Sequence, residues 1–164
     1  TLTKDEPQIF MRKLVDLCSA SGVAIAFVPP LKGVTVFGVT KWINPHKALI
    51  QLSLRGKFED IFWFTFFHEA CHILKHGKRQ VFLEENQSQS HEETEANEFS
   101  RDWLIPRDDW DEYITDNKSY SKKSVIDFAD KINVSPAIVV GRLHHEKRIP
   151  RSFLNDLRRR YDFS

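Results

Sequence analysis

Apolar and polar positions in the first third of the chain predict one helix followed by a small sheet. In residues 5–20 apolar side chains recur at intervals of three and four, which is the helical period, and a Ser-Gly pair follows as a stop. Residues 23–28 form a short β-branched run that two prolines end. Two alternating stretches follow, at 34–39 and 48–54. We therefore expect a helix and then three strands.

The rest of the chain has a helical pattern. Residues 58–76 contain no Gly or Pro, and Gly77 stands where a helix C-cap belongs. After a polar loop at residues 87–90, a second long helix is predicted to end before Pro106. The helices predicted in this part cover residues 58–76, 91–105, 124–132 and 135–145.

The order of these elements predicts an α+β fold. We expect residues 1–106 to form the core and residues 107–164, after a polar connector, to form a helical extension packed on it. The extension also has the small–turn–apolar spacing of a helix-turn-helix, with Ala129, Asn133 and Val139 at the key positions. The would-be recognition helix is mostly apolar, so burial against the core is favoured over DNA binding.

Burial of the extension implies a set of interior side chains and a set of surface charges. The apolar side chains expected inside are Ile126, Phe128, Ile132, Val139 and Leu143. The basic run 158–160 is expected on the surface, where its charges would contribute little to stability. Whether this basic segment binds DNA stays open.

Composition limits the class of protein. The chain has 164 residues, 41% of them hydrophobic, and a formal net charge of +1, which fits one domain with a real core. Its two cysteines, Cys18 and Cys71, are too few for a disulfide scaffold and fit a reducing compartment. The apolar run 61–67 is too short to span a bilayer. We expect a soluble protein of the cytoplasm without a membrane partner.

The pattern His-Glu-x-x-His on the first long helix carries the candidate chemistry. His68 and His72 are four residues apart, so both imidazoles lie on one helix face and can reach one cation. Glu69 is rotated off that axis, where it can act as the general base toward the attacking water. Two surface histidines on an ordinary helix are the alternative. The Phe-rich run before the motif argues against it, because buried histidines need a partner.

A catalytic zinc site needs a third protein ligand and an open fourth position. No third His follows at short downstream spacing, so a carboxylate from the second long helix is the remaining option. The competing residues are Glu92, Glu93, Glu95 and Glu98. An apolar stripe of Ala96, Phe99 and Trp103 places Glu95 at the edge of the buried face, and Glu92, one turn earlier, is the second choice.

Other residues near the motif have less specific roles. Cys71 is expected to be a buried small residue, not a ligand, and His76 to support or cap the site, because a fourth protein ligand would close it. The group that stabilises the oxyanion is open between His91, Tyr113 and Tyr120.

The chain resembles the ImmA/IrrE family of zinc metallopeptidases in two segments, FTFFHEACHILKHG and ETEANEFSRDWLIP, and over residues 20–106 as a whole. The family pattern is a helix with HExxH, an acidic spacer, and an EAN helix that ends in a Leu-Pro type stop. The departures, at Ala70, Cys71 and Ser100, remove no ligand. The resemblance implies a zincin-like fold, Zn²⁺ as the cofactor and Glu95 as the third ligand.

The segment before the motif, PPLKGVTVFGVTKWINPHKALIQLSLR, resembles the form of this domain that follows a helix-turn-helix in HigA-type antitoxins. Together with Thr1 in place of Met, this leads us to expect a DNA-binding part ahead of the chain. The family's partner is typically a helix-turn-helix repressor whose cleavage switches on genes. We therefore expect a zinc-dependent endopeptidase that cuts such a repressor or antitoxin-type regulator, with the strand at 48–54 aligning the substrate by β-addition. The alternative is the regulatory or sensory half of an antitoxin-type transcription regulator, which binds partners without efficient proteolysis.

Overall fold

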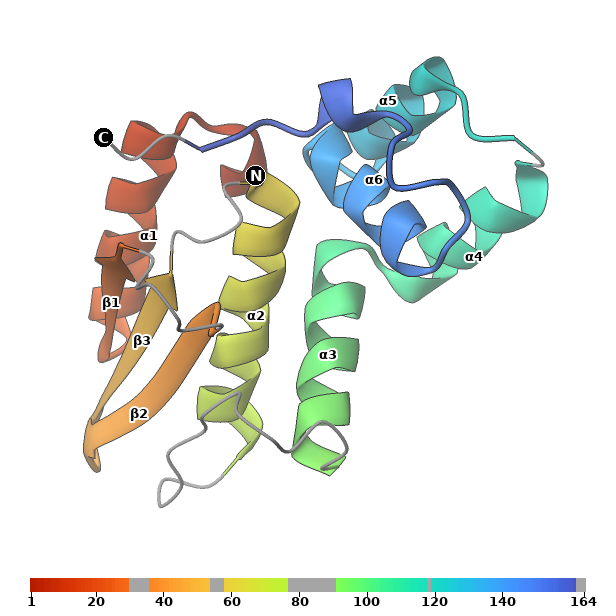
Figure 1. The fold of residues 1–164 in the computed structure, drawn as a ribbon. Coiled ribbons are helices and arrows are strands. Elements are labelled where there is room, and N and C mark those ends of the chain that lie inside the picture. Colours follow the sequence, from red (N-terminus) through yellow and green to blue (C-terminus); the bar gives the residue numbers. More distant parts are fainter. Residues whose placement is uncertain (30–35, 54–57, 77–90, 118, 162–164) are drawn as a thin grey trace.

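The computed structural model describes residues 1–29, 36–53, 58–76, 91–117 and 119–161. Within them the fold is a three-stranded sheet with six α-helices, which confirms the α+β prediction (Figure 1). Of the sequence predictions, the Gly77 cap, the loop at 87–90 and the first part of the strand at 34–39 lie outside the described residues. None of the helices in the described ranges combines the length and apolar character that crossing a bilayer requires.

The elements follow the chain in the order helix, sheet, helices. The α-helices are α1 (Pro7–Ala20), α2 (Glu59–Lys75), α3 (His91–Leu104), α4 (Arg107–Asp116), α5 (Lys122–Lys131) and α6 (Pro136–His145). The strands are β1 (Val23–Val28), β2 (Gly38–Asn44) and β3 (Lys47–Ser53), and the short 3-10 helices are η1 (Leu2–Lys4) and η2 (Asn155–Leu157).

The sheet has the order β1-β3-β2, with β1 parallel and β2 antiparallel to β3. β3 is therefore the central strand, so the expectation that its edge aligns a substrate is wrong. Its alternating residues Ala48, Ile50 and Leu52 are buried, as the period of two predicts. The strand predicted at 34–39 instead runs from Gly38 to Asn44, because a tight turn joins it to β3 and the pairing extends through its polar end.

Helix α2 lies between the sheet and α3 (Figure 1). Its apolar start packs into an aromatic cluster in which Phe10 of α1 contacts both Phe62 and Trp63, with ring centroids 5.2 and 5.0 Å apart. On the other side, Ser100 of α3 donates a hydrogen bond of 2.7 Å to the backbone carbonyl of Phe64. Because Ser100 is small and fully buried, the two helices approach closely at this point.

The segment after Pro106 was expected to be a polar connector but forms helix α4. Asp108 and Asp109 lie in its first turn, where acidic side chains favour a helix, and Trp110 and Tyr113 are buried one turn apart. The predicted polarity was correct for the outer face only, because two large aromatic side chains hold the inner face in place.

Helices α5 and α6 form the expected pair, and α6 packs against α2. Their N-termini are capped by the hydroxyls of Ser121 and Ser135, and the backbone at Asn133 turns through a positive φ of 56° between them. Phe128, Val139 and Leu143 are buried, whereas Ile126 and Ile132 are only partly so. The would-be recognition helix α6 therefore has its apolar face inside the protein.

The basic run at the C-terminus is not a free surface segment, and the expectation that it is energetically neutral is wrong for two of its three residues. Arg158 pairs with Asp60 at 2.8 Å, and Arg159 pairs with the fully buried Glu59 at 2.6 Å. Both partners stand in the first turn of α2. Only Arg160 is exposed. Sequence spacing could not reveal these pairs, because each joins residues about a hundred positions apart.

Candidate metal centre

Helix α2 brings the two motif histidines together on its buried face. His68 and His72 are both buried, and their Nε2 atoms lie 3.2 Å apart. The helical rise of about 5.4 Å per turn places residues i and i+4 on one side, so the short distance follows directly from the spacing. The alternative of two surface histidines does not hold, because only 2% of His72 is exposed.

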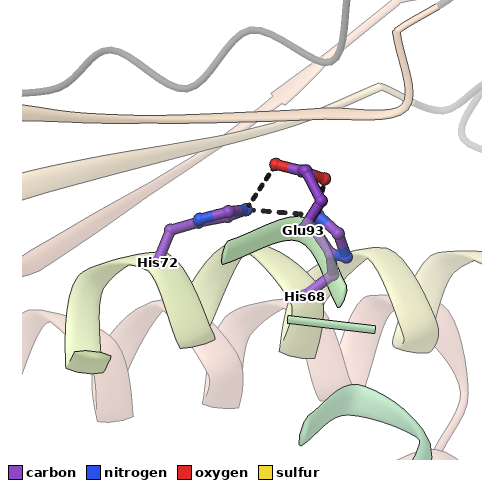
Figure 2. A group of neighbouring side chains, drawn as sticks. All are labelled: His68, His72 and Glu93. Carbon is purple, nitrogen blue, oxygen red and sulfur yellow. Dashed lines mark hydrogen bonds and ion pairs between the residues drawn. The ribbon is translucent and has the colours of Figure 1, made fainter. Parts of the chain in front are cut away.

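The third member of the cluster is Glu93, in the first turn of α3. Its carboxylate oxygens lie 3.2 Å from Nε2 of His68 and 3.4 Å from Nε2 of His72. Figure 2 shows this carboxylate turned toward both rings. Within the described residues, these three side chains form the group whose ligand atoms all lie within 4.8 Å of one another.

The structure therefore does not bring Glu95, the predicted third ligand, into the cluster, and Glu92 does not join it either. Glu95 points elsewhere: its Oε1 accepts a hydrogen bond of 2.8 Å from Lys75, and its Oε2 lies 3.1 Å from Nε2 of His76. Two residues along a helix are about 200° apart, so Glu93 and Glu95 cannot share a direction.

The wrong choice came from the wrong buried stripe on α3. The prediction took Trp103 as an interior residue, but 64% of it is exposed. The side chains that face α2 are Ala96, Ser100 and Leu104, all buried at helical spacing. Glu93 lies one turn before Ala96 on that face, which is why it reaches the histidines.

Each histidine of the cluster is also held through its second ring nitrogen. Nδ1 of His68 lies 3.1 Å from Oδ1 of Asn97. Nδ1 of His72 lies 2.7 Å from Nδ1 of His76, whose Nε2 contacts Glu95. If both Nε2 atoms face a cation, the Nδ1 atoms must carry the protons, so Asn97 and His76 act as acceptors. His76 then donates its Nε2 proton to the Glu95 carboxylate.

The motif glutamate is buried beside the histidines. Glu69 is 2% exposed, and the hydroxyl of Thr40 on β2 donates to its Oε2 at 2.6 Å. β2 comes this close because it begins with Gly38: a Cβ atom there would lie 2.7 Å from Cγ and Oε1 of Glu69 and from Cγ2 of Thr65. The sheet thus fixes one carboxylate oxygen of Glu69 from the side opposite α3.

Sequence reasoning missed three of these residues. Asn97 could have been found, because it stands four residues after Glu93 and therefore on the same face of α3. Thr40 and Gly38 gave no signal, since their contact with Glu69 depends on how β2 crosses α2.

Electrostatics favours neutral, metal-competent imidazoles. Burial lowers the pKa of His72 to about 4, with the neighbouring His68 and His76 acting in the same direction. Burial also raises the pKa of the Cys71 thiol to about 11, so it is a neutral thiol at pH 7. Cys71 is fully buried and lies outside the cluster, as expected.

The donor set fits zinc. Two imidazole nitrogens and one carboxylate match the ligand composition of catalytic zinc sites. With metal–ligand bonds of about 2.0–2.1 Å, neighbouring ligands of a tetrahedral zinc stand ~3.3 Å apart. The three separations observed here are 3.2, 3.2 and 3.4 Å. The side chains are therefore already spaced as a tetrahedral ion requires.

The candidates for oxyanion stabilisation lie elsewhere or carry no supporting contact. Tyr113 stacks on Phe128 at 4.0 Å and shares a hydrogen bond with Ser124, within the C-terminal helices. Tyr120 packs beside Tyr113, and His91 is an exposed residue at the start of α3. None of the three is placed at the cluster.

Comparison with protein families gives one match. Residues 44–144 match the peptidase M78 family, described as the IrrE N-terminal-like domain. Comparison with curated proteins found no match. The matched residues include α2, α3 and the whole metal cluster, and they continue through α4 and α5 to the end of α6. They make up more than half of the chain, which therefore belongs to the IrrE N-terminal-like, or ImmA/IrrE, family and has its metallopeptidase-like fold.

Proposed function

We propose that the protein is a zinc-dependent endopeptidase that hydrolyses a peptide bond in a protein partner. The observation that carries this proposal is the convergence of His68, His72 and Glu93 beside a buried glutamate that is not itself part of the cluster. A purely structural zinc site is closed by four protein ligands, whereas this group has three.

His68, His72 and Glu93 would hold the metal. When bound, zinc supplies a Lewis acid that acidifies a water molecule and polarises the scissile carbonyl. Glu69 is the general base: it takes a proton from the attacking water and later gives it to the leaving amine. Thr40 occupies one oxygen of Glu69, which leaves the other to face the water.

Asn97 and His76 support this chemistry by fixing the two imidazoles. Their hydrogen bonds hold each ring with its Nε2 toward the other ligands. A ligand held in one tautomer and one orientation loses less freedom on binding metal, so these contacts raise metal affinity.

The substrate strand would pair with β2. Among the described residues β2 pairs only with β3, so its second edge is available for backbone hydrogen bonds. β2 also carries Gly38 and Thr40, which contact Glu69. A peptide added at this edge would run past the catalytic carboxylate, which the central strand β3 does not allow.

The partner we propose is a helix-turn-helix repressor or an antitoxin-type regulator in the cytoplasm, as the family resemblance suggests. The alternative, a regulatory or sensory module fused to a DNA-binding part, would bind the same partners without cutting them. The position of Glu69 favours the peptidase, because a module that only binds has no use for a buried base beside the metal ligands.

The test is cleavage of candidate partners by the zinc-loaded protein. Repressors and toxins encoded beside the gene are co-expressed with the wild type and with Glu69→Gln, and their fragments are mapped by mass spectrometry. We expect a defined fragment with the wild type only, at equal zinc content and melting temperature. Binding of a partner without fragments in either sample would instead support the regulatory module.

A further inference from the structure

A cavity of about 630 Å³ lies between α2, α3 and α6 and opens toward the metal centre. On α2 it is lined by Thr65 and Ile61, which stand one and two turns before His68 on the same face. On α3 it is lined by Asn97 and Arg101, one and two turns after Glu93. The cavity therefore continues the trough that holds the metal ligands.

The inner surface of the cavity is apolar. Its apolar lining consists of Phe37, Ile61, Phe64, Leu104, Ile105 and Ile138. These residues come from three helices and from the segment before β2, so they surround a space and do not form a flat patch. A large apolar side chain of a substrate would lose its contact with water there, which favours binding by about 25 cal/mol per Å² buried.

The end of the cavity farthest from the metal ligands is cationic. Four arginines and two histidines line the cavity, against the two carboxylates of Asp60 and Glu98. Three of the arginines are engaged: Arg158 with Asp60, Arg142 with Glu146, and Arg101 with Asp102. Among the described residues, Arg151 is the arginine of this group without an acidic partner, and it is exposed.

We infer that this cavity is the substrate subsite on one side of the scissile bond, and that it selects a large apolar side chain next to the bond and an acidic side chain farther along. This inference rests on the proposed peptidase function. Glu93 and Arg101 are eight residues apart on α3, or ~12 Å at 1.5 Å per residue. An extended peptide covers that distance in about three or four residues at 3.3 Å each. The acidic residue is therefore expected three or four positions from the cut.

The experiment uses the zinc-loaded full chain and a library of peptides from a digested proteome, with cleavage sites identified by mass spectrometry. We expect a bulky apolar residue beside the cut and enrichment of Asp or Glu three or four positions away, on that side only. A peptide found in this way is then compared with its Glu→Lys counterpart. The wild type should prefer the Glu peptide by about fivefold in kcat/KM, the upper range for one exposed ion pair.

The charge-reversed variant Arg151→Glu should lose or invert this preference. Arg12→Glu on α1, which does not line the cavity, is the matched control and should keep it. Cleavage by the wild type without acidic enrichment, or an unchanged preference in Arg151→Glu, overturns the inference and leaves the peptidase proposal intact. If the zinc-loaded wild type cuts no library peptide and no partner, the peptidase proposal fails and the subsite falls with it.

Discussion

The side-chain oxygen of Asn97 lies 3.1 Å from Nδ1 of His68, on the side of the ring that faces away from Glu93. Asn97 and Glu93 are one turn apart on α3, so a single helix both completes the cluster and orients one of its histidines. The proton on Nδ1 then leaves the lone pair of Nε2 free for a cation.

Replacing Asn97 with Ala should weaken zinc binding about 10–100-fold, because His68 loses the acceptor that fixes its tautomer. Competition with a chromophoric chelator measures the affinity. Asn97→Asp keeps an acceptor oxygen and should restore most of it. Equal affinity in the Ala variant and the wild type would mean that Asn97 does not position His68.

Gly38→Ala tests the close approach of β2 to the catalytic carboxylate. The added Cβ would stand 2.7 Å from Glu69 atoms, so the carboxylate must move. We expect cleavage to fall about a hundredfold, the order of loss that a shift of about 1 Å can cause, while zinc content is kept. Lys41→Ala, on an exposed position of the same strand, is the control. Full activity in Gly38→Ala would show that Glu69 needs no such support.

The ion pair of Arg159 with Glu59 makes a prediction about stability. Glu59 is fully buried, and burial raises the pKa of its carboxyl, against which hydrogen bonds from Ser135 and Arg159 act. Arg159→Ser should therefore cost about 2–4 kcal/mol in the free energy of unfolding, somewhat less than for a fully buried pair because Arg159 itself is partly exposed. Chemical denaturation provides the measurement.

Arg160→Ser is the matched control for Arg159, since it removes the same charge from the next position. Arg160 is exposed and stacks only over the Phe58 ring, so its loss should change the free energy of unfolding by less than about 0.5 kcal/mol. Similar values for the two variants would mean that the buried pair contributes nothing, as the sequence alone had suggested.

The sequence predicted what depends on local spacing. The helical period located α1, α2 and α3, and four-residue spacing placed His68 and His72 together. It could not give the register between α2 and α3, which the contact of Ser100 with the Phe64 carbonyl sets. That register decides between Glu93 and Glu95. Exposure of Trp103, an aromatic residue that pattern analysis treats as interior, was the specific source of the error.

Long-range contacts were the other part that spacing could not give. Thr40 reaches Glu69 from a strand 29 residues earlier, and the C-terminal arginines reach the start of α2 from about a hundred residues later. Such contacts depend on where elements pack, and neither a polar threonine in a strand nor an arginine run indicates its partner.

The zinc content of two neighbouring glutamate variants tests the central claim most directly. Glu93→Gln and Glu95→Gln are purified in parallel, dialysed against a mild chelator and measured by atomic emission, with melting temperatures to confirm folding. Because the Glu93 carboxylate lies in the cluster and Glu95 binds Lys75 and His76, Glu93→Gln should lose its zinc, whereas Glu95→Gln should keep most of the single ion held by the wild type. Retention by Glu93→Gln together with loss from Glu95→Gln would contradict this site.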